Sequence, residues 1–382
     1  MRQRMKTGFP AVIVVAMMAM MLFPGIALAQ ESSVIRLDED GYLYYMDYTR
    51  DYYDSETIEV LRKQGFIDAG CSAFFTHNEN GEPMTCRNYD YPHHVSHENR
   101  TITGLNIVLH CKPAGKYESI AMADAVWCDR FNPLLQRGGP DLAGFDVDML
   151  RVLPYECTDG INEKGLCVSF FKVDIPEGDG HGRFAVAISM LVRYMLDDCA
   201  NVSEAIEKVH STIVTPEDWQ DCHLLVTDSE GDHVVIESRN GEVSVIEADI
   251  ATNFYLCAND IEDHYNVRAI YDDAVRIPDE KGELKFNPAY SKGYYHRFVA
   301  MAAQLERYQD RELDQRYTSM PESGAQIILQ SVVQNQYTKS GSSVTQFSVI
   351  YNNAKKTLAV WPFQNYARAY RFDVTGTRLD AQ

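Results

Sequence analysis

The stretch that decides the fold is residues 70–91, which read GCSAFFTHNENGEPMTCRNYDY. Two apolar runs, Cys71–Thr76 and Met84–Tyr89, flank a turn-forming Asn-Glu-Asn-Gly sequence, and this pattern predicts an antiparallel hairpin. A hairpin folds its second strand back along its first, so Arg87 and Asp90 return to the start of the first strand, beside Cys71. The stretch therefore predicts that a thiol, a guanidinium and a carboxylate lie together.

These three groups could form a nucleophilic centre. If the bond between Gly70 and Cys71 is cut, Cys71 gains a free α-amine, whose pKa of about 7.7–8.0 suits a general base near neutral pH. We expect Arg87 to favour the thiolate and Asp90 to orient the α-ammonium by a charge-assisted hydrogen bond. The alternative is that Cys71 is a buried strand cysteine and that Arg87 and Asp90 form a surface ion pair.

Composition and charge limit the classes of protein. The 382 residues are 45% hydrophobic and 24% charged, which is ordinary globular composition. Asp and Glu (55) outnumber Lys and Arg (35), giving a formal net charge of −20 without a basic run. We therefore expect no nucleic-acid partner, because binding phosphates requires clustered cations.

The N-terminus has the pattern of an export signal. Basic residues precede the apolar run 11–23, and Ala27-Leu28-Ala29 supplies the small residues of a cleavage site. We predict a signal peptide over 1–29, with cleavage before Gln30 and a secreted or periplasmic product. A single anchoring helix is the alternative, but Pro24-Gly25 would break it. No later apolar run is long enough to span a membrane.

Residues 30–70 differ from the rest, because six tyrosines crowd an acidic stretch that ends in an expected helix, Ser55–Gln64. We predict a separate unit that packs over the site as a plug and is removed on activation. From Cys71 onward, strands are grouped with strands, which favours antiparallel sheets with helices outside them. We expect helices at 184–196, 202–211, 294–308 and 324–334, and later strands at 223–227, 234–237, 243–246, 344–351, 357–361 and 367–374.

Other chemistry is less well supported. The nine cysteines have scattered spacing, and the chain is large enough to fold without disulfides, so the sequence leaves open whether any of them pair. Because their number is odd, we expect at least one unpaired thiol. His93, His94 and His97 lack the spacing of a metal site and are better read as a solvated loop, so we expect no metal. The glycine-rich loop 174–183 has no phosphate-binding motif, so we expect no cofactor and interpret it as a lid over the substrate.

Several ordered motifs carry a family resemblance. The segment around Cys71 with Arg87-Asn88-Tyr89-Asp90 resembles the opening of the choloylglycine hydrolase and penicillin V acylase family of N-terminal nucleophile (Ntn) hydrolases. Asn162-Glu163-Lys164-Gly165-Leu166, Thr252-Asn253 and His296-Arg297-Phe298 resemble later family motifs. The resemblance implies an α+β fold, a four-layer αββα sandwich of two antiparallel sheets between helical layers, over a catalytic domain 71–382.

The resemblance also implies roles for individual residues. Cys71 is the nucleophile, Asn253 contributes its side chain to the oxyanion hole, Arg297 is a second active-site arginine, and the backbone N–H near Lys172 is the other oxyanion donor. Bile-salt enzymes tend to have Asn at the position of Lys172 and penicillin acylases Tyr, so the usual clue to the substrate is missing. The long segment before Cys71 is more like the self-cleaving precursors of acid ceramidase and of isopenicillin acyltransferases.

The resulting hypothesis is a secreted amidase, activated by cleavage between Gly70 and Cys71, that acts on a small amphipathic N-acyl amide. The sequence does not choose among bile-acid conjugates, penicillin V, acyl-homoserine lactones and other N-acyl amines. Relatives in this fold are often tetramers, so the resemblance allows a homotetramer. Two alternatives are an acyltransferase of the acid ceramidase type and a catalytically inactive binding module that keeps residues 30–70 attached.

Overall fold

The structure is a computed structural model, and Ser32–Gln382 form one compact unit within it. It describes residues 32–54, 57, 70–92, 94–95, 101–102, 105–125, 128, 147–173, 188–212, 222–239, 242–256, 277–278, 284–285, 293–308, 319–334 and 343–380. The expected signal peptide, most of the helix expected at 55–64, and the loop 174–183 lie outside the described residues.

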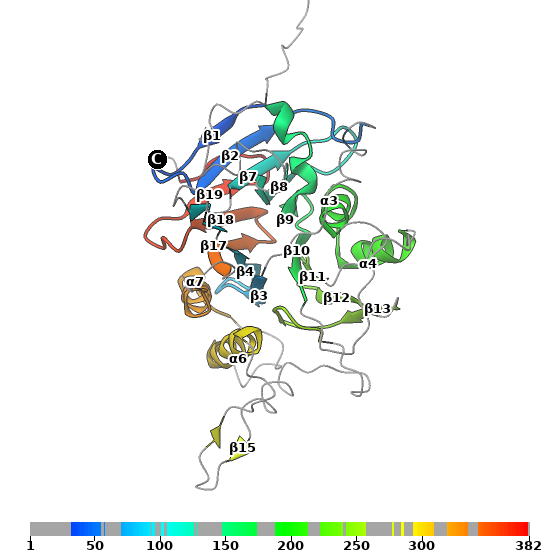
Figure 1. Cartoon of the computed structure of the whole chain (residues 1–382). Coiled ribbons are helices and arrows are strands. Elements are labelled where there is room, and N and C mark those ends of the chain that lie inside the picture. Colours follow the sequence, from blue (N-terminus) through cyan, green and yellow to red (C-terminus); the bar gives the residue numbers. More distant parts are fainter. Residues whose placement is uncertain are drawn as a thin grey trace, which may run out of the picture. The chain divides into compact units, whose positions relative to one another are not determined.

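A six-stranded antiparallel sheet carries the hairpin of residues 70–92 (Figure 1). Its strands lie in the order β14-β3-β4-β17-β18-β19, so the hairpin is extended on one side by a short strand and on the other by the C-terminal meander. The bounds are β3 (Gly70–His77), β4 (Pro83–Pro92), β14 (Ile250–Ala251), β17 (Ser343–Asn352), β18 (Thr357–Pro362) and β19 (Tyr370–Asp373).

A nine-stranded sheet faces it, in the order β1-β2-β7-β8-β9-β10-β11-β12-β13. All its strand pairs are antiparallel except β2 with β7, which are parallel. The bounds are β1 (Val34–Arg36), β2 (Leu43–Tyr48), β7 (Asn106–Cys111), β8 (Ser119–Asp124), β9 (Cys157–Asn162), β10 (Cys167–Lys172), β11 (Cys222–Thr227), β12 (His233–Arg239) and β13 (Glu242–Ile246).

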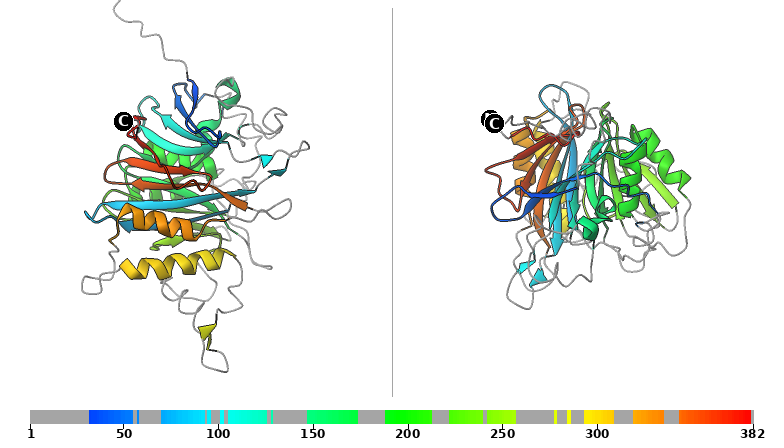
Figure 2. Two further views of the ribbon diagram at one scale, coloured as in Figure 1. Left: turned by 90° about the vertical axis from the view of Figure 1, so that its left-hand side faces the viewer. Right: turned by 90° about the horizontal axis from the view of Figure 1, so that it is seen from above.

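Helices cover the outer face of each sheet. α3 (Ile188–Asp198) and α4 (Val202–Ser211) pack on the nine-stranded sheet, and α6 (Gly293–Leu305) and α7 (Glu322–Ser331) pack on the six-stranded sheet. Figure 2 shows the four layers in the view from above. The predicted α+β sandwich, with two antiparallel sheets between helical layers, is therefore confirmed, and the parallel β2–β7 pair is a local departure from it.

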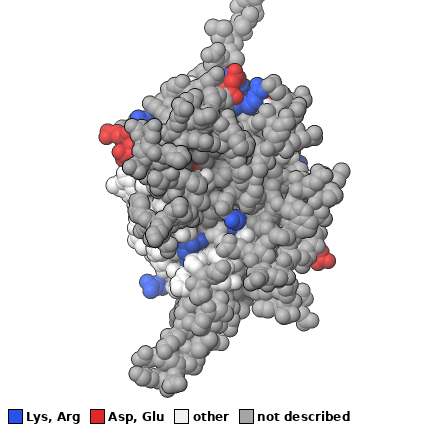
Figure 3. All heavy atoms as spheres, viewed as in Figure 1, with Lys and Arg blue, Asp and Glu red and all other residues white. Residues whose placement is uncertain are grey.

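Smaller elements complete the described chain. They are the strand pairs β5 (His94–Val95) with β6 (Thr101–Ile102) and β15 (Ile277–Pro278) with β16 (Leu284–Lys285), and the 3-10 turns η3 (Val147–Leu150), η4 (Leu153–Tyr155) and η6 (Glu306–Tyr308). None of the helices in the described ranges is both long and apolar enough to cross a membrane. The described Lys and Arg side chains on the face in Figure 3 lie apart from one another.

The β3–β4 hairpin forms as predicted, with strands longer than the sequence suggested. The side-chain oxygen of Asn78 accepts hydrogen bonds from the backbone N–H groups of Asn80 and Glu82, both at 2.9 Å. Gly81 has φ +76°, a left-handed conformation that glycine adopts without strain. This turn fixes the register, which sets Cys71 opposite Tyr89 and Gly70 opposite Asp90.

Residues 32–54 belong to the nine-stranded sheet. β2 pairs with β7 along its whole length, and Leu43 and Met46 are fully buried. Beyond β2, the hydroxyls of Tyr52 and Tyr53 donate to Asp197 of α3 at 2.8 and 2.7 Å. The expectation of a separate unit is wrong for these residues, because they complete a sheet and its core. Their removal on activation stays a prediction.

Candidate active site

Cys71 and Arg87 lie between the two sheets, and both are completely buried. One guanidinium nitrogen of Arg87, Nη2, donates to the Cys71 thiol at 2.8 Å and to the Phe170 carbonyl at 2.7 Å. The other, Nη1, pairs with the Asp159 carboxylate at 2.5 Å and also donates to the Thr158 carbonyl. Arg87 of the hairpin thus donates to backbone carbonyls of the facing sheet. The predicted contact between Arg87 and the Cys71 thiol is present.

The strand register explains this contact. Ala73 lies opposite Arg87, and Cys71 lies two residues from Ala73, so the thiol and the guanidinium are on the same face of the hairpin. That face meets β9 and β10 of the nine-stranded sheet. Because the face alternates along each strand, Asp90 belongs to the opposite side of the hairpin from Arg87.

Burial has the largest effect on the thiol. It raises the pKa of Cys71, and the nearby Asp90 carboxylate raises it further. Arg87 and the backbone N–H of Asp90 lower the pKa of the thiol, but they do not compensate for burial. Arg87 therefore acts in the expected direction, yet Cys71 in the uncut chain is a thiol whose pKa lies above its ordinary value near 9.

The Asp90 carboxylate is fixed from the helical side of the hairpin. One oxygen accepts from the Thr345 hydroxyl at 2.6 Å and the other from the Gln334 amide at 2.9 Å. Thr345 stands at an irregularity in the β17–β4 pairing, where the register shifts between Thr345 and Phe347. Asp90 is fully buried, so the alternative of a surface ion pair between Arg87 and Asp90 does not describe this site.

Asn253 and Arg297 hold the main chain at Cys71. The Asn253 side-chain oxygen accepts from the Cys71 backbone N–H at 3.1 Å and from Arg297 at 2.6 Å. Arg297 also donates to the Cys71 carbonyl at 3.3 Å. The Asn253 amide nitrogen donates to the Lys172 carbonyl at 2.8 Å. All of the residues expected at the site are therefore brought together, with Lys172 contributing a carbonyl contact in this structure.

Sequence reasoning missed the buried partners of these residues. Asp159 is the carboxylate that pairs with Arg87, and it also accepts from the hydroxyls of Thr158 and Tyr351. The sequence did indicate Asp159, because it is a charged residue within a strand just before the turn at Asn162. Thr345 and Gln334 gave no signal, since Thr345 reaches Asp90 through the pairing of β17 with β4, and Gln334 follows α7 and is held beside Thr345 by a backbone hydrogen bond.

The remaining expectations concern metals and disulfides. Within the described ranges, no three His, Cys, Asp or Glu side chains are grouped as a metal site. His93 and His97 lie outside those ranges. Each of the eight described cysteines is a free thiol in this structure, and Cys257 is not among them.

Comparison with known proteins identifies the class. Residues 71–255 match the model of the linear amide C-N hydrolases, choloylglycine hydrolase family. The matched range begins at Cys71 and contains Arg87, Asp90 and Asn253. The chain is therefore a linear amide C-N hydrolase that resembles the choloylglycine hydrolase family over residues 71–255, as its motifs predicted. No curated protein matches the chain.

Three solved structures resemble this one at low sequence identity. A mutant conjugated bile acid hydrolase from Clostridium perfringens is 14% identical, with a TM-score of 0.45 over 82% of this chain and 97% of that one. A penicillin V acylase from Agrobacterium tumefaciens is 17% identical, with a TM-score of 0.46 over 80% and 86%. An N-acylethanolamine-hydrolyzing acid amidase ortholog from Caenorhabditis elegans is 14% identical, with a TM-score of 0.38 over 74% and 93%. The assignment rests on the family model and not on these likenesses.

Proposed function

We propose that this chain is a secreted amidase with Cys71 as its nucleophile, activated by cleavage between Gly70 and Cys71. Its substrate is an N-acyl amide with an amphipathic acyl group, of the conjugated bile salt or penicillin V type. The observation that carries the proposal is the hydrogen bond that Arg87 donates to the Cys71 thiol at 2.8 Å. In the same site, the Cys71 backbone N–H donates to the Asn253 side-chain oxygen. Export is supported by the signal pattern of residues 1–29.

Cleavage would change the charge of the site. The Cys71 nitrogen that now donates to Asn253 would become an α-amine, still within reach of the Asn253 oxygen. Asp90, opposite Gly70 in the hairpin and next to the new terminus, would stabilise the protonated amine. An amine with a pKa of about 7.7–8.0 can then accept the thiol proton near neutral pH.

The reaction follows from these groups. The Cys71 sulfur attacks the substrate carbonyl, the thiol proton passes to the α-amine, and the amine delivers it to the leaving nitrogen as the C–N bond breaks. Water, deprotonated by the same α-amine, then hydrolyses the thioester and restores the thiol. The Asn253 amide has two N–H bonds, of which one meets the Lys172 carbonyl and the other can donate to the oxyanion. Arg87 and Arg297 supply positive charge to the thiol and to the Cys71 carbonyl.

A panel of amides tests the proposal. The purified protein is incubated with glycine- and taurine-conjugated bile salts, penicillin V, acyl-homoserine lactones and N-acylethanolamines, and the released amine and acid are quantified. We expect hydrolysis of at least one member, and none by Cys71→Ala. Addition of a second amine detects acyl transfer, which would appear as a new amide in place of the free acid. Equal hydrolysis by wild type and Cys71→Ala would refute the nucleophile.

A further inference from the structure

The loop that carries Asn253 is fixed at both ends by contacts with the two sheets. Before it, Ala251 of β14 pairs with Ala73 of β3, two residues from Cys71. After it, the backbone N–H of Leu256 donates to the Glu237 carboxylate of β12 at 2.7 Å. Asn253 lies between these two anchors, so its position depends on both sheets at once.

Glu237 is unusual among the anchors because it is a buried carboxylate. Its side chain is fully buried, and the same oxygen that accepts from Leu256 lies 2.9 Å from Nδ1 of His223, which is also fully buried. His223 and Glu237 are directly opposite in the β11–β12 ladder. Burying two titratable side chains costs free energy that an apolar pair would avoid, so packing alone does not account for this pair.

The pair also touches the strand that ends at Lys172. The His223 ring packs edge-on against Phe171, with ring centroids 5.3 Å apart. Phe171 precedes Lys172, whose carbonyl accepts from the Asn253 amide at 2.8 Å. Glu237 thus contacts the Asn253 loop through the Leu256 N–H, and His223 contacts β10 at Phe171, next to the carbonyl that accepts from Asn253.

We infer that His223 and Glu237 are positioning residues that set Asn253 relative to Cys71. Glu237 fixes the loop by its bond to the Leu256 N–H, and His223 orients that carboxylate while packing on the end of β10. The contacts described here lead from these two side chains to the Asn253 loop and to the end of β10, so each acts through Asn253. This inference rests on the proposed function, in which Asn253 stabilises the oxyanion.

The test compares two substitutions at the same position. Glu237→Leu fills the space but removes the acceptor, and kcat should fall about 100-fold with KM within about threefold, because Asn253 is misplaced in the transition state. Glu237→Gln keeps a side-chain oxygen that can accept from Leu256, and its kcat should stay within about threefold of wild type. A merely structural role would lower the folded fraction of both and leave kcat per folded molecule unchanged.

Asp228 provides a matched control from the same hairpin. It is a buried carboxylate at the β11–β12 turn that accepts from the Val202 N–H of α4 at 3.0 Å and from the backbone N–H groups of Glu230 and Asp232 in its own turn. Asp228→Ala should lower stability while kcat per folded molecule stays within about twofold. If Glu237→Leu does not fold, His223→Leu replaces it, with an expected loss of about tenfold in kcat against His223→Gln.

A second readout separates this inference from the proposed function. Amide hydrogen exchange at residues 252–256 reports the anchor directly, and it should accelerate at least tenfold in Glu237→Leu but not in Asp228→Ala. If wild type hydrolyses no amide yet exchange accelerates, the proposed function fails and the anchor stands. If wild type is an amidase and Glu237→Leu keeps both its kcat and its exchange rates, the inference is overturned.

Discussion

Two buried arginine–aspartate pairs lie in this molecule, and they differ in what else each arginine touches. Arg87 pairs with Asp159 and Arg193 pairs with Asp197, both at 2.5 Å with fully buried side chains. Arg87 also donates to the Cys71 thiol, whereas Arg193 donates to the Ser119 hydroxyl at 2.6 Å. The first arginine therefore contacts the proposed nucleophile, and the second makes a structural contact.

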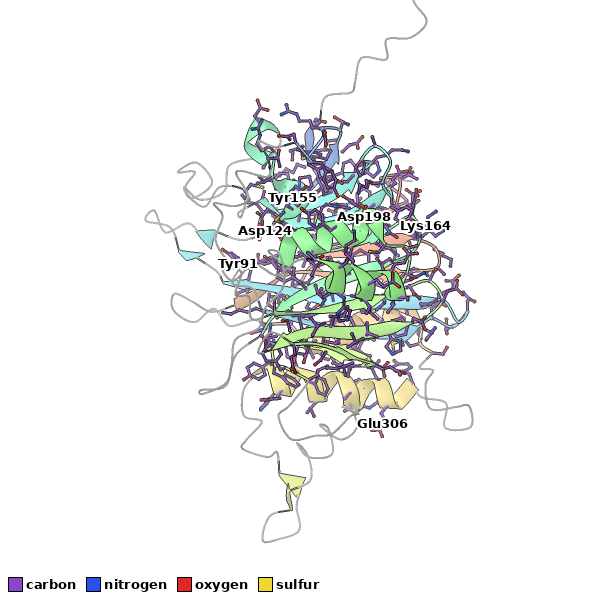
Figure 4. All side chains as sticks on the ribbon, turned by 90° about the vertical axis from the view of Figure 1, so that its right-hand side faces the viewer. Tyr91, Asp124, Tyr155, Lys164, Asp198 and Glu306 are labelled. Carbon is purple, nitrogen blue, oxygen red and sulfur yellow. The ribbon has the colours of Figure 1, made fainter. Side chains whose placement is uncertain are left out.

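The second pair connects the N-terminal segment to the body of the protein. Asp197 accepts from Tyr52 and Tyr53, and the two tyrosine rings pack edge-on against Tyr155. Figure 4 shows Tyr155 near one end of α3 and Asp198 near the other, on the outer side of the nine-stranded sheet. A buried ion pair alone therefore does not identify an active site. The two pairs differ in the further acceptor of the arginine, which is the Cys71 thiol for Arg87 and the Ser119 hydroxyl for Arg193.

The largest effect is expected at the thiol itself. Cys71→Ser keeps a nucleophile of similar shape but loses the sulfur, so amide hydrolysis should fall to near background while the protein still folds. Hydrolysis assays with circular dichroism on the same samples check this. A Cys71→Ala chain with substantial amidase activity would assign the nucleophile elsewhere.

Substitution of the two arginines tests the comparison directly. Arg87→Ala and Arg193→Ala each leave a buried aspartate without its partner and should each lower the free energy of unfolding by about 3–5 kcal/mol. Only Arg87→Ala should also reduce kcat per folded molecule, by about 100-fold or more, because only Arg87 contacts the thiol. Urea titration and active-site counting separate the two effects. Equal kcat losses in both variants would remove the distinction between the pairs.

Asp90 is expected to show the next largest effect. Asp90→Asn keeps one acceptor oxygen for Thr345 or Gln334 but removes the negative charge near Cys71, so kcat should fall about 100-fold with little change in KM. Thr345→Val removes one hydrogen bond to Asp90 and should cost about tenfold in kcat. Steady-state kinetics decide, and near-native turnover in a folded Asp90→Asn would assign this carboxylate a structural role.

The tyrosines of the second pair should affect stability and not catalysis. Tyr52→Phe and Tyr53→Phe each remove one hydrogen bond to Asp197 and should each lower the free energy of unfolding by about 1–2 kcal/mol, while kcat is unchanged. Tyr45→Phe is the control, because Tyr45 lies in the same N-terminal segment but its ring stacks on Phe372 of β19. A fall in kcat per folded molecule would show that the N-terminal segment reaches the site.

The smallest effect is a pH dependence shared by both regions. Burial raises the pKa of Cys71 despite Arg87, and burial raises the pKa of Cys157 to about 12 despite Arg193. The native state therefore keeps these thiols protonated where the unfolded chain ionises them, above an ordinary value near 9. The contribution of Cys157 to the free energy of unfolding should be constant below about pH 9 and should fall as pH rises from 9 toward 12, by about 1.4 kcal/mol per pH unit. The contribution of Cys71 should change in the same direction above about pH 9. Urea unfolding of wild type and Cys157→Ala between pH 8 and pH 10 checks the slope, which should be smaller in the variant.

The hairpin and its chemistry could be predicted because they are local. The Asn78 turn sets the register, and the register places Arg87 near Cys71 without any distant contact. The residues that contact Arg87, Asp90 and the Asn253 loop could not be predicted in this way. Asp159 reaches Arg87 from the facing sheet, Thr345 reaches Asp90 through the pairing of β17 with β4, and Glu237 reaches the Asn253 loop through the Leu256 N–H. No periodicity in the sequence specifies these contacts.

The N-terminal segment shows the limit most clearly. Its tyrosines correctly indicated buried surface, but they were interpreted as a plug over the pocket, whereas Leu43–Tyr48 forms a strand of the nine-stranded sheet. β2 pairs locally with β1, but no local turn indicates its parallel pairing with β7, so its place in the nine-stranded sheet depends on tertiary contacts. Cleavage after Gly70, the first residue of β3, would cut the chain within that strand and would leave the pairing of β2 with β7 in place.

The most direct test of the central claim is the intact mass and N-terminal sequence of the purified protein, measured together with its amidase activity. The account predicts that active wild-type protein contains a chain that begins at Cys71, and that Cys71→Ala stays joined through Gly70 and is inactive. An active wild-type protein in which the Gly70–Cys71 bond is intact throughout would contradict the account, because Cys71 would then have no α-amine to serve as its base.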